Sequence, residues 1–83
     1  MALLNACVTV TLKNGVLDPQ GKAIEGSLSA LGVAGVGSVR QGKIFEIELE
    51  ASSKAIAMEK LNSMCEQLLA NTVIEDYSVE ILK

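Results

Sequence analysis

Few side chains in this chain of 83 residues could carry out chemistry, because it has no histidine and only two cysteines. Without histidine, neither a Ser/His nor a Cys/His nucleophile system can be assembled within the chain. A zinc site would need paired cysteines or histidines, and Cys7 and Cys65 stand far apart in the sequence. We therefore predict no catalytic residue and no metal site, and we interpret both cysteines as buried hydrophobic residues of a reducing compartment.

The most regular acidic pattern is a row of alternating glutamates, Glu46, Glu48 and Glu50. On a strand their carboxylates would stand roughly 6.5–7 Å apart, since each residue rises about 3.3 Å. Such a row could bind a divalent cation or supply an acid pair, but no other type of ligand accompanies it. We favour a solvated sheet face, and a metal-dependent enzyme stays open as an alternative.

A second candidate is the glycine-rich run at residues 32–37, Gly-Val-Ala-Gly-Val-Gly. A phosphate-binding P-loop would also need a Lys-Ser or Lys-Thr pair and a helix that opens after it. The run lacks both, so we interpret it as a structural turn rather than a phosphate loop.

The elements that would position these residues follow from the spacing of the hydrophobic residues. Strands are predicted at 6–13, 44–50 and 77–82 from alternation, and a short bent strand at 36–41 is followed by a turn at Gly42-Lys43. One helix begins at Asp18-Pro19 and stops at Gly32; a second begins at Ser52 or Ser53 and ends near Asn71. This order predicts an α+β, ferredoxin-like β-α-β-β-α-β sandwich, with both helices on one face of an antiparallel sheet.

Composition bounds the class of protein. With a net charge of −3 and no basic patch, nucleic-acid binding is not expected. The chain shows no signal peptide and no run of about 20 hydrophobic residues, so we expect a cytoplasmic protein without a membrane segment. Hydrophobic residues make up 49% of a chain that forms one small domain, 1–83. Such a domain has more apolar surface than one monomer can bury, which predicts self-association or a large partner.

Four stretches together resemble one known family. They are Leu12-Lys13-Asn14-Gly15-Val16-Leu17-Asp18-Pro19-Gln20-Gly21-Lys22-Ala23, Val39-Arg40-Gln41-Gly42-Lys43, Met64-Cys65-Glu66-Gln67-Leu68-Leu69-Ala70-Asn71 and Val73-Ile74-Glu75-Asp76-Tyr77. In order and spacing they are similar to PurS, the small subunit of phosphoribosylformylglycinamidine synthase. The resemblance covers essentially the whole chain.

The resemblance implies a ligase subunit of purine biosynthesis that forms homodimers or tetramers. It implies two further partners, the ATP-dependent synthetase subunit PurL and the glutaminase subunit PurQ. The complex converts formylglycinamide ribonucleotide, ATP and glutamine to formylglycinamidine ribonucleotide, ADP, phosphate and glutamate. The small subunit would bridge the other two and help ammonia pass, without catalytic residues or cofactors of its own; ATP and magnesium would bind to the large subunit.

Within the matched stretches, five surface residues are candidates for partner contact: Lys13, Asn14, Asp18, Arg40 and Lys43. For Asp18 we favour a helix cap over a contact, and for Arg40 and Lys43 we leave both solvated charge and interface open. Three more residues, Gly15, Pro19 and Gly21, are expected to meet backbone requirements.

One alternative of a different class stays open. Ferredoxin-like dimers often bind amino acids at their interface, so the chain could be a small-molecule sensor. The glycine-rich residues 32–37 would then form the ligand loop.

Overall fold

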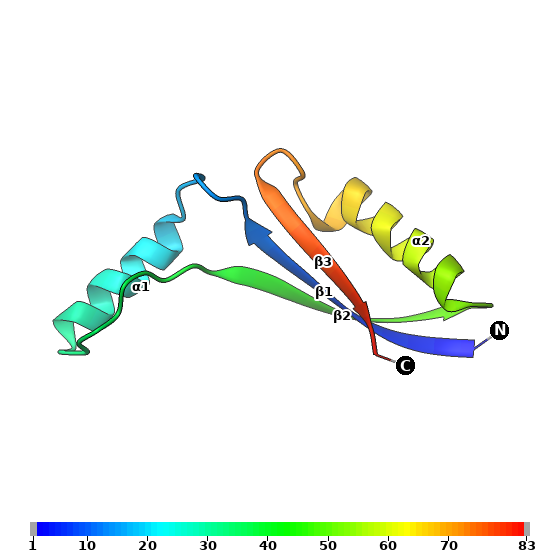
Figure 1. Ribbon diagram of the computed structural model, residues 1–83, viewed down its shortest axis with the longest axis horizontal. Coiled ribbons are helices and arrows are strands. Elements are labelled where there is room, and N and C mark those ends of the chain that lie inside the picture. Colours follow the sequence, from blue (N-terminus) through cyan, green and yellow to red (C-terminus); the bar gives the residue numbers. More distant parts are fainter. Residues whose placement is uncertain (1, 83) are drawn as a thin grey trace.

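The computed structural model describes residues 2–82 and contains a three-stranded antiparallel sheet (Figure 1). Its strands are β1 (Ala2–Leu12), β2 (Gly42–Ala51) and β3 (Glu75–Ile81), in the spatial order β2-β1-β3. Val8, at the middle of β1, pairs with Phe45 of β2 and Val79 of β3. The valine-rich first strand is thus the centre of the sheet, where β-branched residues pack well. The α+β class and the ferredoxin-like arrangement are confirmed.

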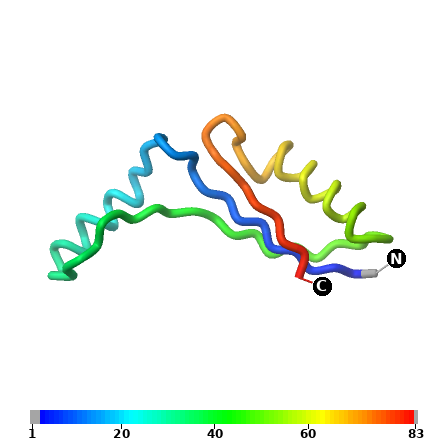
Figure 2. Tube along the Cα trace, viewed as in Figure 1, coloured from blue at the N-terminus to red at the C-terminus, as the bar shows by residue number. Residues whose placement is uncertain are grey.

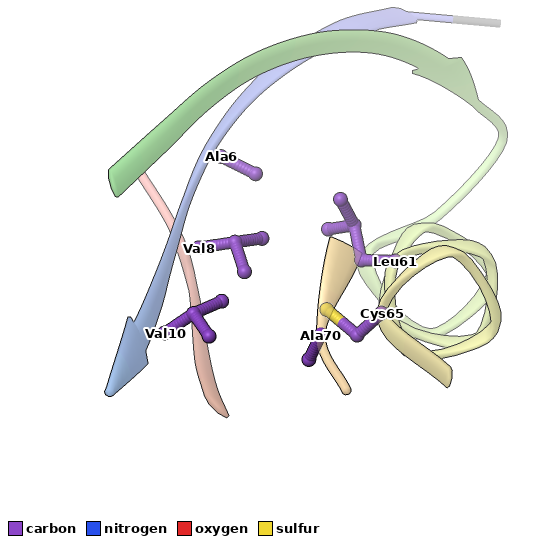
Figure 3. Close-up of a cluster of buried hydrophobic side chains, with 6 residues drawn as sticks. All are labelled: Ala6, Val8, Val10, Leu61, Cys65 and Ala70. Carbon is purple, nitrogen blue, oxygen red and sulfur yellow. The ribbon is translucent and has the colours of Figure 1, made fainter. Parts of the chain in front are cut away.

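The core lies between one face of this sheet and the second helical segment. That segment comprises α2 (Lys54–Met64) and a π-helical turn, η1 (Cys65–Leu69). Leu61 and Cys65 point from it toward Val8 and Val10 of β1, and all four side chains are fully or almost fully buried (Figure 3). The alternation of side chains along β1 therefore determines which face of the sheet is buried under the second helical segment.

The starts of both helical segments and the end of α1 follow local rules that the sequence already displayed, whereas the second segment ends at Leu69 with Ala70 extended and has no left-handed stop near Asn71. Asp18 caps α1 (Pro19–Ala30), and Ser53 caps α2 through its hydroxyl, which accepts a hydrogen bond from the Ile56 N–H at 3.2 Å. After α1 the chain turns at Gly32, whose φ of 84° lies in the left-handed region. No helix within residues 2–82 is long and apolar enough to cross a membrane.

The first helix, α1, departs from the predicted packing. It lies beyond the end of the sheet, and residues 33–41 return beside it without forming a strand (Figures 1 and 2). We call residues 19–38 the arm. Only the second helical segment covers the sheet face, so the expectation that both helices pack there holds for α2 but not for α1.

The predicted strand at 36–41 and the hairpin turn at Gly42-Lys43 are wrong. The Val39 N–H donates to Glu25 in the middle of α1 and the Gln41 N–H donates to Asp18, the cap of α1, so neither bonds to a neighbouring strand. Gly42 and Lys43 then continue directly into β2, opposite Thr11 and Val10.

The two cysteines differ in environment. Cys65 is fully buried against the sheet, as predicted, and the burial raises the pKa of its thiol. Cys7 is only half-buried and lies on the opposite sheet face, between Glu46 and Glu80 of the neighbouring strands. The prediction of a buried residue is therefore wrong for Cys7, because its place in the β1 alternation is one residue out of phase with the core.

Candidate functional site

The predicted partner residues gather at one place, the base of the arm, where β1 ends and β2 begins. Lys13 and Asn14 follow β1, Asp18 starts α1, and Arg40 and Lys43 lie on either side of the start of β2. Their proximity is shown by contacts that join these segments across more than twenty residues of sequence. Asn14 is exposed. Whether the five residues touch a partner stays a prediction.

Asp18 uses both oxygens of its carboxylate and is 7% exposed. Oδ1 accepts a hydrogen bond from the Gly21 N–H at 2.9 Å, and Oδ2 accepts one from the Gln41 N–H at 2.7 Å. The bond from Gln41, followed by that from Gly21, holds the pKa of Asp18 below its usual range. One anion thus caps the helix and also fixes the returning chain.

Gly21 allows the returning chain to approach α1 closely. A Cβ at this position would collide with the carbonyl oxygen of Val39 and would lie 2.8 Å from Asp18 Oδ2. Nearby, Gly15 has a φ of 88°, which glycine adopts without strain, and Pro19 occupies the first turn of α1. Close approach at Gly21, positive φ at Gly15 and the first-turn position of Pro19 each suit the residue type found there.

Two more charged side chains hold the same segment. Arg40 Nη2 donates to the carbonyl oxygens of Leu12 at 2.8 Å and Lys13 at 3.1 Å. Glu25 Oε2 accepts a hydrogen bond from the Val39 N–H at 2.9 Å. Sequence reasoning missed Glu25, because a single acid on a polar helix gives no signal that its partner lies fourteen residues away.

The two lysines of the candidate set form ion pairs within the chain. Lys13 Nζ lies 2.9 Å from Asp76 Oδ1, and Lys43 Nζ lies 3.6 Å from Glu75 Oε2. Glu75 also accepts a hydrogen bond from the Asn71 N–H at 2.6 Å. The lysines are about half exposed, so these pairs contribute little stability and leave the lysines accessible to a partner.

A concavity of about 470 Å³ opens beside the base of the arm, with Asp18, Lys43 and Glu75 in its lining. Asp18 is bound to backbone N–H groups, and Lys43 is paired with Glu75. No nucleophile and base are brought together among these charged groups, so the arrangement favours holding and docking over bond-making.

The remaining sequence candidates lie elsewhere. The glutamates of the acidic row, Glu46, Glu48 and Glu50, are exposed on the sheet face away from α2. Among the described residues, no group of three potential ligands is placed to hold a metal ion. Residues 32–37 are exposed at the end of the arm; the turn itself lies at residues 31–32, and residues 33–37 are irregular, with Gly35 at a φ of 85°.

Together, the fold and the site define a small α+β protein whose charged side chains fix backbone segments around a projecting arm. Residues 5–83 match the family model PurS, described as phosphoribosylformylglycinamidine (FGAM) synthase. The chain belongs to the PurS family.

Similar proteins agree over most of the chain. A PurS subunit of phosphoribosylformylglycinamidine synthase from Synechocystis is 53% identical over 89% of this chain and 74% of that protein. The Mycobacterium leprae PurS subunit is 46% identical over 93% of this chain and 94% of its own.

Solved structures agree as well. A chain of PurLQS from Thermotoga maritima has a TM-score of 0.91 at 36% identity and covers 99% of this chain and 100% of its own. PurS from Methanocaldococcus jannaschii, a subunit of formylglycinamide ribonucleotide amidotransferase, has a TM-score of 0.87 at 36% identity, with 96% of both chains covered. The detached position of α1 is thus part of a fold shared with experimentally determined chains.

Proposed function

We propose that this chain is the assembly subunit of phosphoribosylformylglycinamidine synthase in purine biosynthesis. It joins a PurL synthetase and a PurQ glutaminase, and it associates with further copies of itself. The complex is a ligase that converts formylglycinamide ribonucleotide, ATP and glutamine to formylglycinamidine ribonucleotide, ADP, phosphate and glutamate. The observation that carries the proposal is the likeness of nearly the whole chain to a chain of PurLQS.

The division of labour follows from the chemistry of the reaction. ATP and magnesium bind to the large subunit, and glutamine is hydrolysed on the glutaminase. Ammonia released at one site must reach the other before it escapes into water. A subunit that holds two proteins in register and excludes water from their junction contributes by positioning and exclusion, without forming bonds itself. The two free cysteines support a cytoplasmic location, because disulfides are rare in that reducing compartment.

The base of the arm is the surface that we assign to partner contact. It brings Lys13, Asn14 and Lys43 to one end of the sheet, next to the concavity. Buried Asp18 and exposed Arg40 support this surface by binding backbone groups of the neighbouring segments.

Reconstitution tests the proposal. PurL and PurQ are assayed for formylglycinamidine ribonucleotide synthesis with and without this chain, first with glutamine and then with ammonium salt as nitrogen source. We expect the glutamine-dependent rate to require the chain and the ammonia-dependent rate of PurL to be much less affected. Equal glutamine-dependent rates with and without the chain would refute the proposal.

A further inference from the structure

The arm meets the rest of the molecule through a small number of polar contacts. α1 does not pack on the sheet, and residues 31–38 are exposed. Within one chain, the arm is therefore held by its attachment at the base, where the chain leaves β1 and returns to β2.

Three charged side chains hold this attachment, and we call Asp18, Glu25 and Arg40 the clasp. The contacts involve three successive residues of the returning chain. Glu25 accepts a hydrogen bond from the Val39 N–H, and Asp18 accepts one from the Gln41 N–H. Between them, the Arg40 side chain donates to the backbone at the end of β1. Each contact joins a charged side chain to the backbone, at 2.7–3.1 Å. Hydrogen bonds to charged groups are among the stronger ones in proteins.

The clasp is separate from the core that folds the sheet. The core consists of residues of β1, α2, η1 and Ala70, and none of its members is in the arm. Loss of a clasp contact removes nothing from that cluster. The contacts at the base of the arm and the core of the sheet thus involve different side chains.

We propose that the clasp is a conformational lock that fixes the arm at one angle to the sheet, and that opening it frees the arm while the sheet stays folded. A fixed arm loses less conformational entropy when it docks than a free one does. The consequence for assembly rests on the proposed function: a chain with an open clasp associates more weakly.

Amide hydrogen exchange of the full chain, followed by NMR, tests the lock directly. Asp18→Asn keeps one acceptor, so the helix cap at Gly21 can persist while the second bond is lost. We expect exchange at Gln41 to accelerate roughly tenfold or more, the size expected when a charged hydrogen bond is removed. Glu25→Ala should do the same at Val39, and Glu25→Gln, which retains an acceptor, should restore protection.

A matched control lies at the other end of the molecule. Lys60 Nζ donates to the Glu50 carbonyl oxygen at 3.1 Å, a cation-to-backbone contact like that of Arg40 but outside the arm. Lys60→Ala should leave the exchange of Val39 and Gln41 unchanged, and Arg40→Ala should accelerate both. In every variant the Val8 amide reports whether the sheet is folded. If clasp variants leave Val39 and Gln41 protected, or expose Val8 equally, the proposal is wrong.

The angle itself can be measured by electron spin resonance. Spin labels at Ser29→Cys in the arm and Ser78→Cys in β3, in a Cys7→Ser background, report the distance between arm and sheet; excess unlabelled protein suppresses signals between copies. We expect one narrow distribution for the intact clasp and for Lys60→Ala, and a broad one for Arg40→Ala. A narrow distribution in Arg40→Ala would overturn the lock.

The consequence for assembly is read from the reconstituted complex. Arg40→Ala should raise, roughly tenfold or more, the concentration of chain that gives half-maximal glutamine-dependent synthesis, whereas Lys60→Ala should not. An unchanged concentration for a variant whose arm is shown to be free would refute the link to assembly. If the unaltered chain itself gives no stimulation, the proposed function fails, and the exchange and distance measurements still decide on the lock.

Discussion

A pair of glycines in α1 provides the sharpest test of the close approach at the base of the arm. Gly21 and Gly26 lie on the same helix, five residues apart. A Cβ at position 26 would meet no atom within 4 Å, whereas one at position 21 would collide with the Val39 carbonyl oxygen. The same substitution, glycine to alanine, should therefore have opposite effects at the two sites.

The magnitudes follow from two terms. Alanine favours the helix over glycine by about 0.8–1 kcal/mol in a helix interior, and this term alone acts at Gly26. At Gly21 the returning chain must move away, which breaks the Val39–Glu25 hydrogen bond; a bond to a charged group contributes about 1.5–3 kcal/mol. Gly21→Ala should thus destabilise the arm by about 0.5–2 kcal/mol net, while Gly26→Ala stabilises it by about 1 kcal/mol.

The assay must report on the arm itself, because α1 contributes nothing to the core cluster. Native-state amide exchange of α1 residues gives the local free energy of opening, and Val8 serves as the reference for the sheet. We expect slower exchange in α1 for Gly26→Ala and faster exchange for Gly21→Ala. Slower exchange in both variants would refute the close approach.

Three further predictions concern the core and two titrating groups. Leu61→Ala, at a fully buried position facing β1, should lower the free energy of unfolding by about 2–5 kcal/mol in urea melts; no change would contradict the packing of α2. The pKa of Asp18 is lower in the folded chain than its ordinary value of 3.8, so its contribution to stability is fully present above pH 3.8. This contribution is lost as the pH falls through the folded pKa. In Asp18→Asn, acid melts should no longer show this part of the pH dependence. Tyr77 is the only tyrosine, and the hydrogen bond to Glu66 at 2.8 Å raises the pKa of its hydroxyl above 10.0; an absorbance titration should show this, and Glu66→Ala should move the pKa back toward 10.0. An unchanged pKa in that variant would assign the rise to another cause.

Elements with local signals could be predicted from the sequence. The alternation of Phe45, Ile47 and Leu49 with glutamates identified β2, because side-chain direction on a strand depends only on the residue count. The cap of α1 was predictable because it is also local: Asp18 accepts a hydrogen bond from an N–H only three residues away. In both cases the signal lies within a few consecutive residues.

Long-range choices could not be predicted. Residues 36–41 contain valines that favour a strand, yet a strand also needs a neighbour to accept its N–H groups. Here Glu25 and Asp18 provide those acceptors instead, and nothing in the sequence indicates that residues 25 and 39, or 18 and 41, meet. The second oxygen of Asp18 was missed for this reason, although the residue itself was identified.

Polar and apolar groups have different roles in the arm. Its apolar side chains are largely exposed along α1 and the returning chain: Ile24, Leu31, Val33 and Val36. Covering such a surface is favourable, but hydrophobic attraction has no direction and does not by itself place one protein at a defined angle to another. Direction comes from the charged contacts of the clasp, which are short and geometrically restricted. An assembly subunit needs both properties, because ammonia transfer requires partners that are held together and also aligned.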